Sequence, residues 1–173
     1  EPPPQITNVA WCLPYTNINP MLLDVTFNKN VYGNSLGTDD LEAIDFSLSI
    51  DGGDAQLASP TPSAIDFTAN PVIRLSVDLD GSLPDGNETV TVVPSSATAI
   101  WDGCGNAASI IQSNNTIKLI NRIPPVINSI AIDPVSDNYV DVTFSEKVYK
   151  FPTSGGTVLT PLEPTDFSLS IVS

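Results

Sequence analysis

The sequence predicts an all-β fold in which two antiparallel sheets pack face to face, and three observations support it. Apolar and polar residues alternate with period two over several short segments, which is typical of strands with one buried face. Aspartate–glycine and proline–aspartate–glycine turns separate these segments. No segment carries a convincing helical stripe of apolar residues. The fold class is therefore predicted from short strands and tight turns alone.

The predicted strands follow one another along the first 122 residues. The clearest are Leu23–Phe27, Asp45–Ile50 and Ile73–Leu79, where every second residue is apolar. Shorter strands are predicted at Gln5–Ala10, Ala55–Ala58, Glu88–Val93, Ala97–Trp101 and Thr116–Ile120. Seven or eight such strands favour an immunoglobulin-like antiparallel β-sandwich, and a small β-barrel or a jelly roll is the alternative.

An internal repeat sets the domain organisation. The segments Pro4–Ile6, Asp24–Phe27 and Asp45–Ile50 return as Pro125–Ile127, Asp141–Phe144 and Asp166–Ile171. The first and last segments are displaced by 121 residues, and the middle one by 117. The sequence therefore predicts a tandem array, with a complete repeat at 1–122 and the truncated N-terminal part of a second copy at 123–173. The second copy would be completed by following residues or by another chain.

Short stretches between and within the copies add two expectations. The proline-rich segments Glu1–Pro4 and Arg122–Pro125 are predicted to be short, stiff linkers, because proline fixes φ and favours extended backbone. Residues 39–44, which follow Thr38, are expected to form a short turn at most. Proline stands at position 164 of the corresponding stretch in the second copy, and proline is disfavoured inside helices.

The amino-acid composition limits the classes of binding partner and the cellular location that we expect for the protein. The 173 residues carry a net charge of −14 with only six lysines and arginines, which argues against nucleic acid and anionic membrane surfaces as partners. No apolar run is long enough to span a bilayer, so no membrane insertion is expected. The chain begins at Glu1 and shows no signal peptide, and we expect an internal piece of a longer extracellular protein.

The two cysteines are candidates for a disulfide. A Cys12–Cys104 bond would close a loop of about 90 residues and add roughly 4 kcal/mol to stability on the chain-entropy estimate. The even count and the extracellular composition favour this bond. The alternative is two unpaired thiols.

A calcium site is the candidate metal chemistry. Asp78, Asp80, Asp85 and Asp102 lie on or beside glycine turns, and calcium takes six to eight oxygen ligands from such turns. The spacing matches no EF-hand loop, and solvated turn carboxylates are the alternative reading. Apart from this calcium, no cofactor is expected.

Catalysis and sugar binding find less support. The chain has no histidine, and Cys104 has no neighbouring base in the sequence. Paired carboxylates such as Asp78 and Asp80 are ordinary solvent-facing residues of a strand end. We therefore expect that the chain is not an enzyme. Aromatic side chains that could form a sugar platform are Trp11, Tyr15, Tyr32 and Trp101. A place in the core or between the sheets is the alternative for Trp101.

Four segments, in the order they hold within one unit, carry a resemblance to a known group: VTFSEKVY (142–149), DFSLSI (166–171), ETVTVV (88–93) and AIWDGCGNA (99–107). They resemble the bacterial Ig-like repeats found in tandem in very large secreted surface proteins. The first copy departs from that pattern with Asn28-Lys29 where the second has Ser145-Glu146.

The resemblance implies a non-enzymatic repeat of an adhesin, stalk or filament at the cell surface. Its implied partners are neighbouring repeats of the same chain, or a homo-oligomer or filament. The alternative is a module that binds cell surfaces or glycans through loops at one end of the sandwich.

Overall fold

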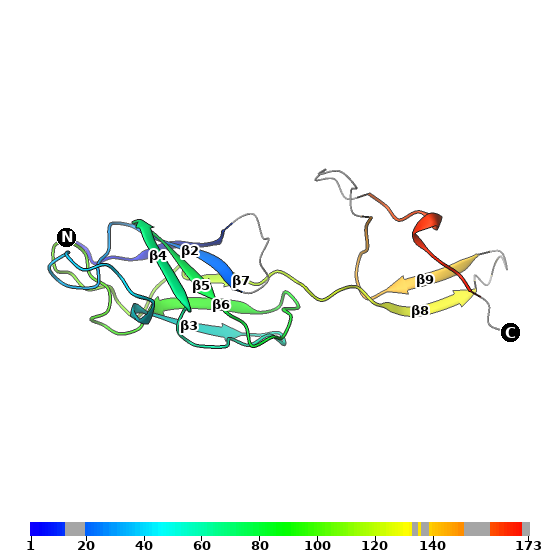
Figure 1. The fold of residues 1–173 in the computed structure, drawn as a ribbon, viewed down its shortest axis with the longest axis horizontal. Coiled ribbons are helices and arrows are strands. Elements are labelled where there is room, and N and C mark those ends of the chain that lie inside the picture. The colour runs from blue at the N-terminus through cyan, green and yellow to red at the C-terminus, as the bar shows by residue number, and fades with distance from the viewer. Residues whose placement is uncertain (13–19, 133–134, 136–138, 151–159, 171–173) are drawn as a thin grey trace. The chain divides into compact units, whose positions relative to one another are not determined.

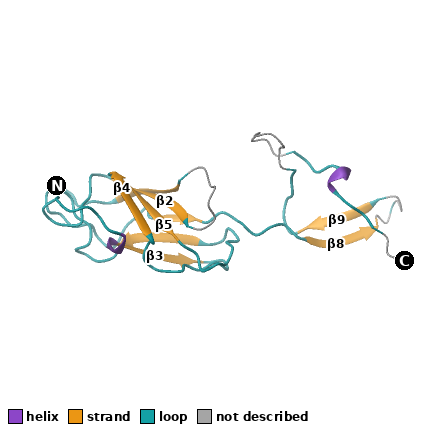
Figure 2. Cartoon of the chain, viewed as in Figure 1, coloured by secondary structure: helices purple, strands orange, loops and turns teal. Residues whose placement is uncertain are grey.

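The computed structural model describes residues 1–12, 20–132, 135, 139–150 and 160–170. Contacts divide the chain into two compact units, unit 1 from Glu1 to Ile123 and unit 2 from Pro124 to Ser173. In its described residues each unit contains antiparallel strands, loops and a single turn of 3₁₀ helix (Figure 2). The all-β prediction is confirmed. Across those same residues, no helix has the length and apolar character needed to cross a bilayer.

The larger sheet of unit 1 has the strand order β1-β2-β5-β4, with every neighbouring pair antiparallel. Its strands are β1 (Ile6–Trp11), β2 (Met21–Phe27), β4 (Ala64–Ala69) and β5 (Val72–Val77). In β2, Leu23, Val25 and Phe27 are buried and the residues between them are only half-buried, as the period-two pattern predicts. Asp24, on the opposite face, forms an ion pair of 2.7 Å with Arg74 on β5.

The smaller sheet of unit 1 has the order β3-β6-β7 and lies as a second layer beside the first (Figure 1). Its strands are β3 (Phe46–Asp51), β6 (Thr89–Pro94) and β7 (Thr116–Lys118). Apolar side chains from both layers form one buried cluster, in which the rings of Phe27 and Phe46 lie 6.4 Å apart. Because each sheet covers the apolar face of the other, unit 1 has the sandwich core that the sequence predicts.

Two predicted strands were wrong, and one strand was missed. Ala55–Ala58 and Ala97–Trp101 form isolated bridges through Leu57 and Trp101 rather than strands. Conversely, strand β4 was not predicted. It is an edge strand of the sheet with a register irregularity between Asp66 and Ala69, and its sequence does carry the alternation, since Ile65, Phe67 and Ala69 are separated by polar residues.

Unit 2 reproduces the local structure of unit 1 where the sequence repeats. Strands β8 (Ile127–Ile132) and β9 (Val140–Phe144) pair antiparallel, as β1 and β2 do. The register shifts at the same place in both hairpins, between Ile127 and Ser129 in unit 2 and between Ile6 and Asn8 in unit 1. The 3₁₀ helices η1 (Ala43–Asp45) and η2 (Pro164–Asp166) follow at equivalent positions, and each has a reciprocal capping box. The predicted short turn at 39–44 is thus the 3₁₀ turn η1 and the loop before it.

Several apolar positions that are buried in unit 1 are exposed in unit 2. Leu48 is 3% exposed, whereas Leu169 at the equivalent position is 80% exposed. Val9 and Ile130 show the same contrast, at 7% and 64%. Residues 167–170 are not a strand, although the equivalent residues form β3 in unit 1, because β3 depends on its pairing with β6. Sequence alone does not produce this strand; the neighbouring strand is needed.

The pair Leu48 and Leu169 gives a matched test of the core. We expect Leu48→Ala to lower the free energy of unfolding of unit 1 by about 2–5 kcal/mol, because it leaves a cavity in a packed core. Leu169→Ala should change it by no more than about 0.5 kcal/mol, since the side chain is exposed. Urea unfolding followed by tryptophan fluorescence reports unit 1 alone, because both tryptophans, Trp11 and Trp101, lie in it. Equal effects of the two substitutions would contradict the assignment of the core.

Candidate functional site

A buried carboxylate in the loop between β6 and β7 holds its own turn and contacts the loop that follows β2. Asp102 is almost completely buried and accepts hydrogen bonds from the backbone amides of Cys104 (3.0 Å) and Asn106 (2.9 Å). The ammonium of Lys29 lies 3.3 Å from Asp102 Oδ2 and 2.8 Å from Glu1 Oε1. Burial raises the pKa of Asp102, but the hydrogen bonds from Asn106, Cys104 and Lys29 outweigh it and hold the pKa far below its usual range. This carboxylate is therefore a fixed structural acceptor.

A second buried carboxylate holds the loops at the other end of unit 1. Oε1 of Glu88 accepts hydrogen bonds from the backbone amides of Asp54 (3.1 Å), Ala55 (3.1 Å) and Asp85 (3.0 Å). Oε2 accepts one from Gly86 at 3.0 Å. Burial raises the pKa of Glu88, yet these amides outweigh burial and lower it to about 2. Glu88 thus ties the loop after β3 to the loop before β6.

The close approach of Glu88 also explains a glycine. Gly53 has a φ of +57°, which favours glycine, and its Cα faces the Glu88 carboxyl group so closely that a Cβ would not fit. The sequence motif Asp51-Gly-Gly-Asp54 is therefore more than a tight turn, since it makes room for the carboxylate that holds it.

The structure does not bring the four predicted calcium ligands together. Asp78 follows β5, whose end pairs with the beginning of β2 at Met21. Asp102 instead lies beside Lys29, which follows the other end of β2. Grouping Asp102 with the other three was therefore wrong, because its oxygens serve its own turn and Lys29.

The remaining predicted ligands lie in the loop between β5 and β6. Asp80 Oδ1 accepts a hydrogen bond of 2.9 Å from the Ser82 amide, which lowers the pKa of Asp80, and Asp85 Oδ1 accepts one of 2.8 Å from the Asn87 amide. Both are thus side-chain acceptors within their own turns. In the part of the chain that the structure describes, no three histidine, cysteine, aspartate or glutamate side chains are grouped to hold a metal ion. Calcium binding at this loop stays a prediction.

The predicted Cys12–Cys104 disulfide is absent, and the fold gives the reason. The amide of Cys12 pairs with Leu22 at the beginning of β2, whereas Cys104 lies 3.5 Å from Glu1, in the loop cluster beyond the end of β2. A strand of this length separates its ends by about 20 Å, and a disulfide needs Cα atoms within about 7 Å. The Glu1 carboxylate raises the pKa of Cys104, so its thiol stays protonated at neutral pH.

The candidate sugar-binding aromatics do not form a common exposed surface among the described residues. The indole Nε1 of Trp11 donates to the Lys118 carbonyl (2.9 Å), and that of Trp101 donates to the Thr98 carbonyl (2.9 Å). The backbone of Trp101 also pairs with Tyr32 in both directions, at 2.8 Å each. Both indoles are half-buried, so each contributes to local structure. Tyr15 lies outside the described residues.

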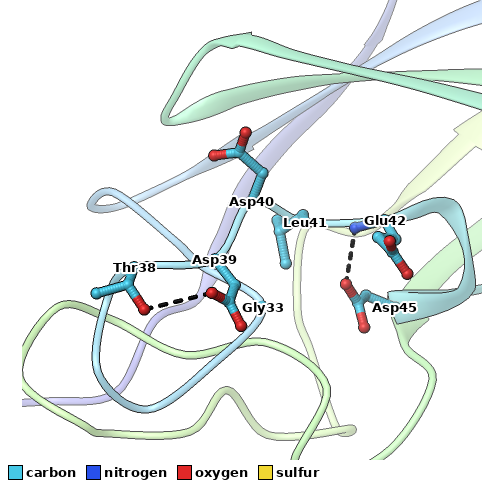
Figure 3. A pocket seen from close by; sticks show the side chains of 7 residues that line it. All are labelled: Gly33, Thr38, Asp39, Asp40, Leu41, Glu42 and Asp45. Carbon is cyan, nitrogen blue, oxygen red and sulfur yellow. Dashed lines mark hydrogen bonds between the residues drawn. The ribbon is translucent and has the colours of Figure 1, made fainter.

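An acidic pocket that the sequence analysis missed lies beside η1. It has a volume of about 670 Å³ and is lined by Gly33, Thr38, Asp39, Asp40, Leu41, Glu42 and Asp45 (Figure 3). The carboxylate of Asp45 accepts the Glu42 amide at 2.8 Å, and Thr38 donates to Asp39 at 3.3 Å. Burial raises the pKa of Asp45 despite the Glu42 amide. The signal in the sequence was four acidic residues within the seven positions 39–45.

We expect Glu88→Gln to lower the free energy of unfolding of unit 1 by about 2–4 kcal/mol, because an amide NH₂ would face backbone donors in a buried site. The pKa of Glu88 is about 2 in the folded state, below its usual value of 4.5. Its stabilisation is therefore present above about pH 4.5 and is lost as the pH falls towards 2.

Urea unfolding at a series of pH values measures both effects. The wild-type chain should lose stability between about pH 5 and pH 2, and Glu88→Gln should flatten that loss. Asp51→Asn, which removes an exposed carboxylate from the end of β3, is the control and should keep the wild-type profile. An unchanged pH profile in Glu88→Gln would refute the role assigned to this carboxylate.

Calcium at the loop between β5 and β6 has a direct test in chelation. If the ion binds there, adding a chelator to the protein should lower the melting temperature by several degrees, because a ligand that binds only the folded state stabilises it. Asp80→Asn should then remove the effect of the chelator. An identical melting temperature with and without chelator would exclude the site.

Comparison of the chain with known proteins found no match to a protein-family model, a curated protein or a solved structure. The comparisons therefore add no activity, ligand or relative to the geometry.

Proposed function

We propose that this chain is a stretch of Ig-like tandem repeats from a long extracellular bacterial surface protein, where it extends or assembles a shaft without enzymatic activity. The observation that carries the proposal is the recurrence of one local structure in both units. The hairpin β8–β9 and the turn η2 repeat the register, the irregularity and the capping box of β1–β2 and η1. Repetition of a unit along a chain is typical of proteins that extend.

The strand order supports the Ig-like assignment. When β1 to β7 are read as strands A to G, the two sheets have the orders A-B-E-D and C-F-G. This is the arrangement of constant-type immunoglobulin sandwiches, and neither an up-and-down barrel nor a jelly roll has it. The order is a property of topology, so it supports a scaffold and not a particular ligand.

The contacts of the charged and aromatic side chains favour extension over recognition. Glu88 and Asp102 each serve several backbone amides, and Trp11 and Trp101 are hydrogen-bonded to backbone carbonyls. Lys29 binds both the carboxylate of Glu1 and the carbonyl of Pro2, so the proline-rich segment is attached to its own sandwich. A glycan-binding platform would instead present aromatic faces to solvent.

A protein made of three joined copies of residues 1–121 tests the proposal by small-angle X-ray scattering. Each copy should span about 40 Å, so a rod of about 120 Å with a radius of gyration near 35 Å is expected. A compact particle with the same number of residues would have a radius of gyration of about 21 Å, and that result would contradict the proposal. Replacing the linker prolines with glycine and serine in the same protein is the control, and it should broaden the distribution of lengths.

A further inference from the structure

The acidic pocket of unit 1 has a structural counterpart in unit 2. The amide of Gly33 donates to the carbonyl of Asp39 at 2.9 Å, and the amide of Lys150 donates to the carbonyl of Thr160 at 3.0 Å. Both pairs are followed by the same capping box, Glu42 with Asp45 in unit 1 and Glu163 with Asp166 in unit 2. Backbone contacts therefore place Lys150 at the position of Gly33.

In unit 2 the equivalent carboxylates bind an ammonium group. Lys150 Nζ lies 3.2 Å from Glu163 Oε2 and 3.2 Å from Asp166 Oδ1. In unit 1 the side chain that would provide this ammonium is missing, because position 33 is glycine. A Cβ built on Gly33 would lie 3.7 Å from Asp45 Oδ2, so a side chain at this position would extend towards the same carboxylate.

The two sites differ in charge as well as in shape. Unit 1 has Asp39 and Asp40 where unit 2 has Thr160 and Pro161, so the pocket without the lysine is also the more acidic one. The pKa values follow this difference. That of Asp166 is lowered by the Glu163 amide and by Lys150, whereas that of Asp45, which has the same amide contact, is raised by burial.

We propose that the pocket of unit 1 is a binding site for an alkylammonium group from outside the unit, either the side chain of a lysine on a partner protein or a free amine. Glu42 and Asp45 would bind the ammonium as Glu163 and Asp166 bind Lys150, and Asp39 and Asp40 add negative charge at the rim. Exposed ion pairs contribute little free energy, so a single amine should bind weakly, with a dissociation constant on the order of ten millimolar or higher. Repeats in series would strengthen binding to a partner with several lysines. The proposal rests on the equivalence of the two units and not on the extracellular role.

Amide chemical shifts of the ¹⁵N-labelled 173-residue chain test the proposal directly. Titration with Nα-acetyl-lysine amide and with 1,5-diaminopentane at low salt should shift the amides of Gly33, Glu42 and Asp45. Tetramethylammonium, which carries the charge but has no N–H donor, should leave them unshifted. Tighter binding of the lysine derivative would indicate a partner protein as the source, and tighter binding of the diamine a free amine. Equal shifts with tetramethylammonium, or no shift with either amine, would overturn the proposal.

Calcium is the competing ligand and is titrated in the same way. Shifts of the same amides by calcium at concentrations below those of the amines would identify a divalent-cation site and overturn the proposal. Addition of calcium without such shifts would support it, because a lysine ammonium needs only the two carboxylates seen around Lys150.

Two reciprocal variants exchange the residues at the equivalent positions 33 and 150. Gly33→Lys should fill the pocket as Lys150 does and weaken amine binding by about tenfold or more, which corresponds to about 1.4 kcal/mol. Lys150→Gly should create a new site whose amine shifts appear at Glu163 and Asp166. Unchanged amine binding in folded Gly33→Lys would overturn the proposal.

Gly33→Lys can fail to fold, because a Cβ at this position would lie 2.8 Å from the Asp40 carbonyl oxygen. A third variant tests the proposal in that case. The double substitution Asp39→Asn with Asp40→Asn changes two exposed side chains and should weaken amine binding several-fold. Ser47→Ala on β3 is the control and should bind amines as the wild type does. Equal binding by the double variant and the wild type would overturn the proposal.

Discussion

Coverage of one sheet by another is the constraint on which the structure of this chain depends. A strand with alternating apolar residues presents one apolar face, and this face stabilises the fold only when a second layer removes it from water. In unit 1 the sheet β1-β2-β5-β4 and the sheet β3-β6-β7 cover each other, and their side chains form one core. In the described part of unit 2, the hairpin β8–β9 is the one sheet that forms, and most of its apolar residues are exposed.

Beyond the ends of the sheets, buried carboxylates accept hydrogen bonds from the backbone amides of the loops. Glu88 and Asp102 lie at opposite ends of unit 1, and each satisfies backbone amides of loops that have no strand partner. Burying a charged group is unfavourable unless it is hydrogen-bonded, and here the amides and Lys29 provide those bonds. The strongly acidic composition is thus partly structural, because acidic side chains fix the turns. The four acidic residues beside η1 are different, since Asp39 and Asp40 have no acidic counterpart in unit 2.

Sequence patterns predicted the central strands well and the contacts between distant residues poorly. Strands such as β2 and β5 have strict alternation, so their buried faces could be assigned from local sequence. Strand β4 was missed although Ile65, Phe67 and Ala69 alternate with polar residues, so its signal was present in the sequence. The predicted disulfide was wrong because the number of cysteines says nothing about the distance between them. The acidic pocket was missed because it depends on contact between Gly33 and Asp45, which are 12 residues apart in the sequence. The internal repeat was the most useful signal, since it later identified Lys150 as the counterpart of Gly33.

The central claim is that unit 2 has the same fold as unit 1 once its second layer is supplied. Joining residues 51–121 of this chain directly after Ile171 continues the repeat in register and supplies the equivalents of β4 to β7. Hydrogen–deuterium exchange should then slow at the amides of β8 and β9 by about 100-fold or more, because they become part of a cooperatively folded unit. Exchange at these amides that is as fast as in the 173-residue chain would contradict the account.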